Sequence, residues 1–381
     1  MKILYCIPHL YNSGGMERVL TQKVNWLAAH TNHAITVLTT EPTPQGMNDC
    51  FFPLDPRVNV VGLSVDFNAD YHLPIWRKWC GHMRRIRTYE RLLRAYIRTH
   101  AIDICISMGG KEIAFLYRLP CRTMVEMHFS KDQRRQLLLA NHSGAFWSLI
   151  GTIRTRQLVR AVRPLEQLIV LTDADRQDWR RAGCENVTVI PNPCCIHTTI
   201  RPMNTQKTKT VLAVGRLHEQ KGFDLLLQAW QTIAKDYPDW SLRIVGEGDK
   251  RSELETQIQQ YGIPRVLLAG ATREILSEYE AASIFVLSSR YEGLPLALIE
   301  AMGCGLPCIA FDCPQGPQEL LTDERGWLVP NGDTTALAGQ IAYVIAHPQE
   351  ATQRAEKAQA YIQTNYSEEV IMRRWEQLIE R

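Results

Sequence analysis

The sequence lacks any apolar run that approaches the roughly 20 residues needed to cross a membrane as a helix. Its apolar start, residues 1–8, is too short for a signal peptide and predicts a buried first strand. No low-complexity tract and no internal repeat of solenoid period is found. These absences exclude a helical membrane protein and a repeat protein, so we expect a soluble or peripheral protein.

The cysteines also lack the regular sequence spacing that is typical of metal sites and disulfide frameworks. There are 11 of them, scattered from Cys6 to Cys313, without the paired spacing of a metal site. Cys304, Cys308 and Cys313 come nearest to a cluster, but an apolar stretch separates the last two. We therefore expect free thiols in a reducing cytoplasm, with neither a disulfide framework nor bound zinc.

The length and the hydrophobic pattern indicate two α/β domains. A chain of 381 residues exceeds what one hydrophobic core usually holds. Apolar runs alternate with helical patterns, which is typical of parallel sheets in doubly wound, Rossmann-like domains. Strands are expected near residues 2–8, 34–40, 58–63, 103–107, 122–127, 167–172, 187–190, 210–215, 240–245, 266–269, 284–288, 308–311 and 327–329. We place the domains at 1–195 and 210–365, with a proline-containing hinge at 196–209.

The net charge of +3 conceals an asymmetry between the two halves. Residues 1–190 contain 25 lysines and arginines against 16 aspartates and glutamates, whereas the remaining residues contain 18 against 24. A basic amino-terminal half and an acidic carboxyl-terminal half result. The basic half predicts contact with an acidic surface or an acidic acceptor.

Residues 76–98 concentrate this positive charge, with eight lysines and arginines against one acid. Trp76 and Trp79 begin the segment, and its apolar residues between 86 and 97 are spaced as one face of a helix. Two interpretations stay open: a helix on an anionic membrane surface, or a core-facing helix with a solvated basic face. A second basic and apolar stretch spans 146–163. No recognition motif for nucleic acid accompanies the charge, so we expect no such partner.

The most informative stretch runs from Glu292 to Glu300. Proline is favoured in the first turn of a helix, so Pro295 predicts a helix start, with Glu292 in the loop before it and Glu300 in the second turn. The unpaired N–H groups of the first turn, around Gly293 and Leu294, suit a phosphate. Carboxylates repel phosphate, so each glutamate is better suited to hydroxyl groups on either side of it. A sugar nucleotide has this layout.

A cationic loop precedes this stretch in the chain. The apolar run 211–214 predicts a strand, and Gly215, Arg216, Lys221 and Gly222 follow its carboxyl end. Open α/β sheets bind ligands at that end of their strands. Arginine can bind phosphate oxygens through two N–H groups and lysine supplies a compact charge, so Arg216 and Lys221 are candidates for binding a diphosphate.

The sequence resembles the retaining glycosyltransferases of family 4, which have the GT-B fold. The resemblance is carried by Glu292 and Glu300 with seven residues between them, Gly215-Arg216, Lys221-Gly222, Val245-Gly246-Glu247-Gly248 and the stretch 288–321. It is looser in the first half, where Gly14-Gly15-Met16-Glu17 and His128 match. Gly14-Gly15 is not a Gly-x-Gly-x-x-Gly fingerprint, so no nicotinamide cofactor is specified.

The resemblance implies two Rossmann-like domains facing a central cleft, with residues 366–381 forming a helix that crosses back to the first domain. It implies that Glu300 binds the nucleotide ribose, that Glu292 binds the donor sugar and that His128 lies near the reacting sugar. The donor-binding residues would be Gly15, Arg216, Lys221, Gly293, Leu294 and Glu300, and the catalytic residues Glu292, His128, Arg216 and Lys221.

Asp173 and Asp175 formally match the Asp-x-Asp metal site of the other main glycosyltransferase fold. Thr172 before them is a good helix N-cap, however, so we interpret both carboxylates as first-turn charges that favour the helix dipole. Lysine and arginine can stabilise the departing diphosphate without a cation. We expect no metal and no cofactor, with a UDP-sugar as co-substrate.

The sequence thus predicts a membrane-peripheral enzyme at the inner face of the cell membrane. It would move a hexose or N-acetylhexosamine from a UDP-sugar to a lipid-linked or surface glycan, with retention at the anomeric carbon. Two alternatives stay open: a GT-B nucleotide-sugar epimerase, and a catalytically silent subunit that binds sugar nucleotides in a glycan assembly complex.

Overall fold

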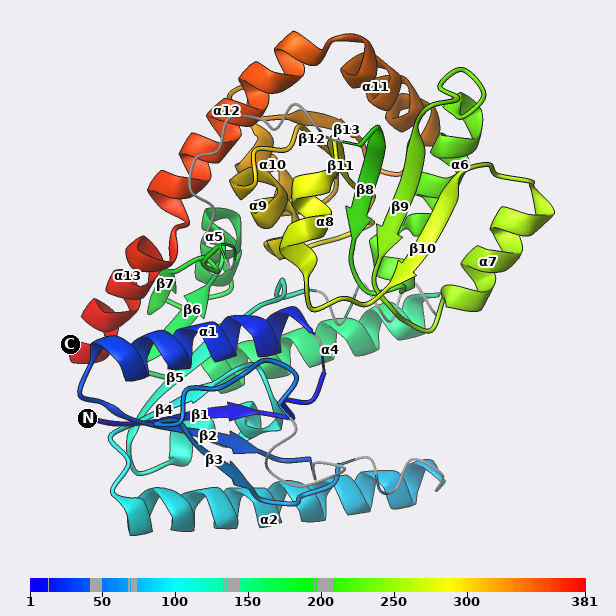
Figure 1. Ribbon diagram of the computed structural model, residues 1–381. Coiled ribbons are helices and arrows are strands. Elements are labelled where there is room, and N and C mark those ends of the chain that lie inside the picture. The colour runs from blue at the N-terminus through cyan, green and yellow to red at the C-terminus, as the bar shows by residue number, and fades with distance from the viewer. Residues whose placement is uncertain are drawn as a thin grey trace. The chain divides into compact units, whose positions relative to one another are not determined.

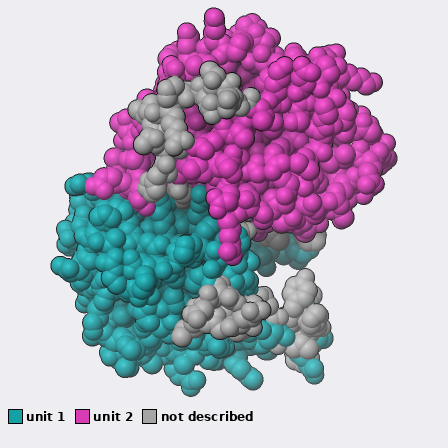
Figure 2. All heavy atoms as spheres, in the orientation of Figure 1, with its two compact units in different colours: residues 1–191, 372–381 teal, residues 192–371 magenta. Residues whose placement is uncertain are grey.

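The computed structural model describes residues 1–12, 14–41, 50–67, 69, 74–132, 135, 144–194, 196 and 208–381, without the side chains of 75, 76 and 145. The chain divides into two compact units (Figure 2). Unit 1 comprises residues 1–191 and 372–381, and unit 2 comprises residues 192–371. Most of the predicted hinge at 196–209 lies outside the described residues.

Unit 1 is built on a parallel sheet of seven strands with the order β3-β2-β1-β4-β5-β6-β7 (Figure 1). Its strands are β1 (Lys2–Ile7), β2 (Ala34–Thr39), β3 (Asn59–Gly62), β4 (Ile104–Ser107), β5 (Arg122–Met127), β6 (Gln167–Val170) and β7 (Val187–Val189). Its helices are α1 (Gly15–His30), α2 (Ile75–His100), α4 (Ala145–Val162), α5 (Asp173–Arg181) and the part of α13 (Glu368–Glu380) from residue 372 onward. The short 3-10 helices η1 (Lys111–Ala114) and η2 (Leu116–Arg118) follow β4.

Unit 2 repeats this plan with six parallel strands in the order β10-β9-β8-β11-β12-β13. The strands are β8 (Thr210–Val214), β9 (Ser241–Val245), β10 (Val266–Gly270), β11 (Ile284–Leu287), β12 (Cys308–Asp312) and β13 (Trp327–Pro330). The helices are η3 (Glu219–Lys221), α6 (Phe223–Ile233), α7 (Arg251–Gln260), α8 (Ile275–Ala281), α9 (Leu296–Gly303), α10 (Pro317–Leu321), α11 (Thr334–Ala346) and α12 (Pro348–Asn365).

The predicted α/β class with two doubly wound parallel sheets is confirmed. Each predicted strand is present, and its ends differ from the expectation by at most two residues. The largest difference is in β6, which was expected to reach residue 172. It ends at Val170 because Thr172 instead caps α5, accepting a hydrogen bond from the backbone N–H of Asp175.

The strand order places the first strand of each sheet in its interior, third from one edge. In unit 1 the chain adds strands on one side of β1 and then on the other, and β8 has the same position in unit 2. Ligands of open α/β sheets bind at this switch point, outside the carboxyl ends of the strands. In unit 1 α1 and α2 lie on opposite faces of the sheet (Figure 1), and Tyr89, Leu93 and Ile97 of α2 are buried in the core.

Candidate functional site

In unit 2 two loops meet at the switch point, because they follow the neighbouring strands β8 and β11. Residues 215–222 follow β8 and residues 288–294 follow β11. The Ser288 hydroxyl donates to the carbonyl of Lys221 at 2.9 Å, and the N–H of Arg290 donates to the carbonyl of Gln220 at 2.8 Å. These bonds join the predicted diphosphate-binding loop to the loop of Glu292.

Lys221 and Glu292 form an ion pair. The Lys221 Nζ lies 2.7 Å from Glu292 Oε1, and the Ser289 hydroxyl donates to the same oxygen at 2.6 Å. Only 7% of the Glu292 side chain is exposed. An ammonium has three N–H donors, so Lys221 can bind Glu292 and still contact a phosphate. The sequence predicted both residues for the site but not that they bind each other.

The helix α9 begins at Leu296, one residue later than predicted. Pro295 has an extended backbone conformation (φ −73°, ψ 104°) and takes the N-cap position instead of the first turn. Glu300 lies in the second turn as predicted, is buried, and accepts a hydrogen bond from the Tyr279 hydroxyl at 3.0 Å. The amino end of α9 thus follows Gly293, Leu294 and the N-cap Pro295, which is an arrangement that favours an anion.

Arg216 is exposed two residues after the end of β8, and no ion pair is found for it within the described part of the chain. The loop that carries it packs tightly against Gly246 and Gly248. A Cβ at Gly246 would lie 2.0 Å from the carbonyl oxygen of Gly215, and one at Gly248 would lie 2.3 Å from that of Leu217. The two glycines therefore allow the close approach that sets the position of Arg216.

In unit 1 Gly15 lies beyond the loop that follows β1, and His128 directly follows β5. Gly15 is the first residue of α1, a helix of 16 residues. His128 follows β5 and is buried, with its Nε2 3.1 Å from Glu126 Oε1. Unit 1 therefore carries these two predicted residues, and unit 2 carries Arg216, Lys221, Gly293, Leu294, Glu292 and Glu300.

Glu126 connects His128 to a buried cation. Its other carboxylate oxygen binds the Lys23 ammonium, and the side chains of Lys23 and Glu126 are 0% and 1% exposed. The Lys23 Nζ also lies over the Trp375 ring, 4.2 Å from its centroid. Burial acts to raise the pKa of Glu126, but Lys23 and His128 outweigh it and lower that pKa to about 2. Burial lowers the pKa of Lys23.

Sequence reasoning missed Lys23 and Glu126. The available signal was Glu126 itself, the lone acid inside the buried strand β5, because a buried carboxylate requires a partner. Arg290 and Asp224 were also missed as site residues. They form an ion pair with two hydrogen bonds, at 2.6 and 2.8 Å, between the loop of Glu292 and the first turn of α6.

Asp173 and Asp175 lie in the first turn of α5, as we interpreted them. Asp173 pairs with Arg176 at 2.6 Å, and Asp175 accepts from the Thr172 hydroxyl at 2.9 Å. Within the described ranges no group of three metal-binding side chains is found. No helix in those ranges is long and apolar enough to cross a bilayer.

Comparison with known proteins gives a family match in the second half of the chain. Residues 199–361 match the model of the glycosyl transferases group 1. The chain is 28% identical to the amylovoran biosynthesis glycosyltransferase AmsD of Erwinia amylovora over 99% of both chains. It is 26% identical, over 91% of its length and 89% of the relative, to a Campylobacter jejuni alpha-1,4-N-acetyl-D-galactosaminyltransferase that is named for a glycan on PP-undecaprenol.

Solved structures agree on the fold. A TarM variant from S. aureus, in complex with Fondaparinux, alpha-GlcNAc-glycerol and UDP, superposes with a TM-score of 0.80 over 100% of both chains, at 16% sequence identity. The predicted GT-B architecture and the resemblance to the group 1 enzymes are therefore confirmed: the fold is that of solved GT-B structures, residues 199–361 match the group 1 model, and the chain is similar over its length to glycosyltransferases.

Proposed function

We propose that this glycosyltransferase moves a hexose or N-acetylhexosamine from a UDP-sugar to a lipid-linked or surface glycan, with retention at the anomeric carbon. The observation that carries the proposal is the Lys221–Glu292 pair beside the amino end of α9. It provides a cation and helix N–H groups for a diphosphate and a carboxylate for sugar hydroxyls. The UDP bound in the TarM variant and the N-acetylhexosamine named for the Campylobacter relative support this choice of donor.

In the proposed reaction, Lys221, Arg216 and the first N–H groups of α9 bind the diphosphate and stabilise the charge that develops as it leaves. Glu292 orients the sugar hydroxyls and favours the positive charge at the anomeric carbon. Glu300 binds the ribose, and its position is fixed by the Tyr279 hydroxyl. We propose that His128, whose Nε2 lies 3.1 Å from Glu126 Oε1, acts near the reacting sugar. We propose that no metal takes part.

The test offers the purified protein a panel of UDP- and GDP-sugars with bacterial lipid extract, and detects products by mass spectrometry. Proton NMR of the glycosylated product then gives the anomeric configuration. We expect transfer from one UDP-sugar with retention. Inversion would contradict the mechanism, donor conversion without acceptor would indicate an epimerase, and UDP binding without turnover would indicate a silent subunit.

We further propose that the amino-terminal part of α2 docks the enzyme on the anionic inner face of the cell membrane. Tyr89, Leu93 and Ile97 of α2 are buried in the core of unit 1. They belong to the apolar helix face between residues 86 and 97 that the sequence analysis identified, so this face is directed at the core. Trp79 is nevertheless 66% exposed and Met83 is 37% exposed. Together with Arg84, Arg87 and Arg91, they line a groove of about 530 Å³. Aromatic and basic side chains together suit a membrane interface.

A liposome experiment tests this docking. Replacing Trp79 by Ser and Arg84 and Arg87 by Gln should weaken binding to phosphatidylserine vesicles by about thirtyfold, since each basic residue contributes about 1 kcal/mol. Arg180→Gln with Arg181→Gln on α5 removes the same charge elsewhere in unit 1 and serves as the control. Equal sedimentation of wild type and the α2 variant would contradict the docking proposal.

A further inference from the structure

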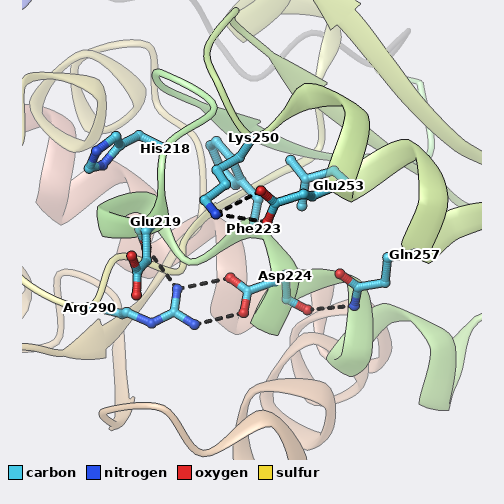
Figure 3. Close-up of a pocket in the computed structure, with 9 residues that line it drawn as sticks. His218, Glu219, Phe223, Asp224, Lys250, Glu253, Gln257 and Arg290 are labelled. Carbon is cyan, nitrogen blue, oxygen red and sulfur yellow. Dashed lines mark hydrogen bonds and ion pairs between the residues drawn. The ribbon is translucent and has the colours of Figure 1, made fainter. Parts of the chain in front are cut away.

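The Arg290–Asp224 ion pair lies at the edge of a pocket of about 380 Å³ in unit 2 (Figure 3). Arg290 belongs to the loop of Glu292, and Asp224 lies in the first turn of α6, directly after the loop of Lys221. The guanidinium faces the carboxylate edge to edge, with Nη1 2.8 Å from Oδ1 and Nη2 2.6 Å from Oδ2. Nη1 also donates to the carbonyl of Glu219 at 2.7 Å. Neither arginine nor aspartate has a role in the reaction proposed above.

Further bonds run between the same two loops. The Gln220 side-chain amide donates to the carbonyl of Tyr291 at 3.0 Å, and the backbone bond from Arg290 to Gln220 lies beside it. Asn331, directly after β13, donates to the carbonyl of Arg290 at 3.1 Å. Gln220, Arg290 and Tyr291 are each one or two residues from Lys221 or Glu292. The position of one catalytic candidate is therefore coupled to the position of the other.

Gly222 brings the loops into direct contact. It has a positive φ of 61°, which glycine adopts without strain, and a Cβ there would lie 2.1 Å from the carbonyl oxygen of Ser288. This contact limits how closely the two loops approach, but it does not prevent one loop from sliding along the other. The Arg290–Asp224 pair opposes such sliding, because its two N–H···O bonds can both form only when the guanidinium and the carboxylate are aligned.

We propose that Arg290 and Asp224 are positioning residues that hold Lys221 and Glu292 in register for the transfer reaction. The inference rests on the proposed function of the Lys221–Glu292 pair. Arg290 touches neither donor nor acceptor in this account. It acts by fixing the loop after β11 to the first turn of α6, so that the ammonium and the carboxylate meet the donor in one geometry. A small displacement of such groups lowers the rate steeply.

The exposure of the pair favours a role in positioning over a role in stability. The side chains of Arg290 and Asp224 are 31% and 39% exposed. Ion pairs with this degree of exposure contribute little to folding. Removing the pair should therefore leave unit 2 folded, and its effect should appear in the site. Burial acts to raise the pKa of Asp224, while the hydrogen bonds and charge of Arg290 lower it, so the pair stays ionised at neutral pH.

The chain offers a matched control in unit 1. Arg122 donates to the Glu166 carboxylate through both Nε and Nη2, and the two side chains are 29% and 39% exposed. Its Nη1 also donates to a backbone carbonyl, that of Ile379. This pair resembles Arg290–Asp224 in geometry and exposure, yet it lies at the amino end of β5, away from the predicted residues. Arg122→Gln should therefore remove an equivalent pair without affecting the reaction.

The experiment compares Arg290→Gln, Asp224→Asn and Arg122→Gln in the full chain. We expect the first two to lower kcat by at least about tenfold, with a smaller change in KM for the UDP-sugar. We expect Arg122→Gln to stay within about twofold of wild type, as distant surface changes usually do. Arg290→Lys keeps the charge but not the two parallel bonds, so it should restore part of the rate.

A second measurement does not depend on activity. Hydrogen exchange of the backbone amides in 215–222 and 288–294 should be faster in Arg290→Gln than in wild type and unchanged in Arg122→Gln. If the wild-type chain transfers no sugar, the proposed function fails, while the exchange data still report on the coupling of the loops. Equal exchange and equal kcat in Arg290→Gln and Arg122→Gln, both folded, would overturn the inference.

Discussion

The buried pair Lys23–Glu126 allows a prediction whose size follows from its burial. Both side chains are essentially inaccessible, and each is the principal ionic partner of the other. Removing one partner of such a pair leaves an uncompensated charge in the interior and costs about 3–5 kcal/mol. We therefore expect Lys23→Met and Glu126→Gln each to destabilise unit 1 by about 4 kcal/mol. The double change Lys23→Met with Glu126→Leu should recover most of this loss, because an apolar pair of similar volume replaces the two ions.

Native-state hydrogen exchange is the appropriate assay, because a chain of two units need not unfold in one step. Amides of β1 and β5 report on the opening of unit 1, while amides of β8 and β11 in unit 2 are the internal control. The reasoning would be refuted if either single variant lost less than about 1 kcal/mol, or if the double variant lost the sum of the two, since coupled residues are non-additive.

The same pair predicts how unit 1 responds to acid. The pKa of Glu126 is lowered in the folded state to about 2, from an ordinary value of 4.5. A lowered carboxyl pKa contributes stability that is complete above the unfolded pKa and is lost as the pH falls toward the folded pKa. Wild-type unit 1 should therefore lose stability between about pH 4.5 and pH 2. The Lys23→Met with Glu126→Leu variant should lose less over that interval, and parallel acid titrations of unfolding would contradict this.

Three further predictions concern the site. Arg216→Ala and Lys221→Ala should each weaken UDP-sugar binding at least about tenfold, because a charge-assisted contact is worth roughly 1.5–3 kcal/mol; unchanged affinity by calorimetry in both would remove the diphosphate assignment. Glu292→Gln should lower kcat by about a hundredfold, or about 2.7 kcal/mol, whereas Glu300→Gln should chiefly raise KM for the donor; initial-rate kinetics with the reverse pattern would exchange their roles. Turnover should continue in excess EDTA, and an absolute requirement for magnesium or manganese would contradict the metal-free mechanism.

The sequence was sufficient for the fold because buried parallel strands appear as short apolar runs. Each of the strands β1 to β13 was located this way, and at the site the ends of β8 and β11 and the start of α9 each differ from the expectation by one residue. Glycine and proline positions were equally informative, because they indicate turns, helix ends and close backbone contacts. Gly222, Gly246 and Gly248 mark the places where two backbones touch, although the sequence does not show which backbone each one meets.

The pairings between distant residues could not be predicted, because they depend on which strands are neighbours. Lys221 and Glu292 are far apart in the chain, and each was assigned to the donor separately. Their mutual contact follows from the adjacency of β8 and β11, which the apolar pattern leaves open. The same holds for Lys23 and Glu126, which lie in α1 and β5: the sequence does not show that this lysine and this glutamate are buried against each other.

The contact between Gly222 and the carbonyl of Ser288 has a consequence for protein engineering. A Cβ at Gly222 would lie 2.1 Å from that oxygen, so the two loop backbones are in direct contact. The backbone conformation of each loop therefore depends on that of the other. A chimera that takes residues 215–222 from a relative but keeps residues 288–294 of this chain would combine two loops whose backbones do not fit each other. Attempts to change the donor sugar should therefore exchange both segments as one cassette, with residue 224 included so that Arg290 keeps its partner.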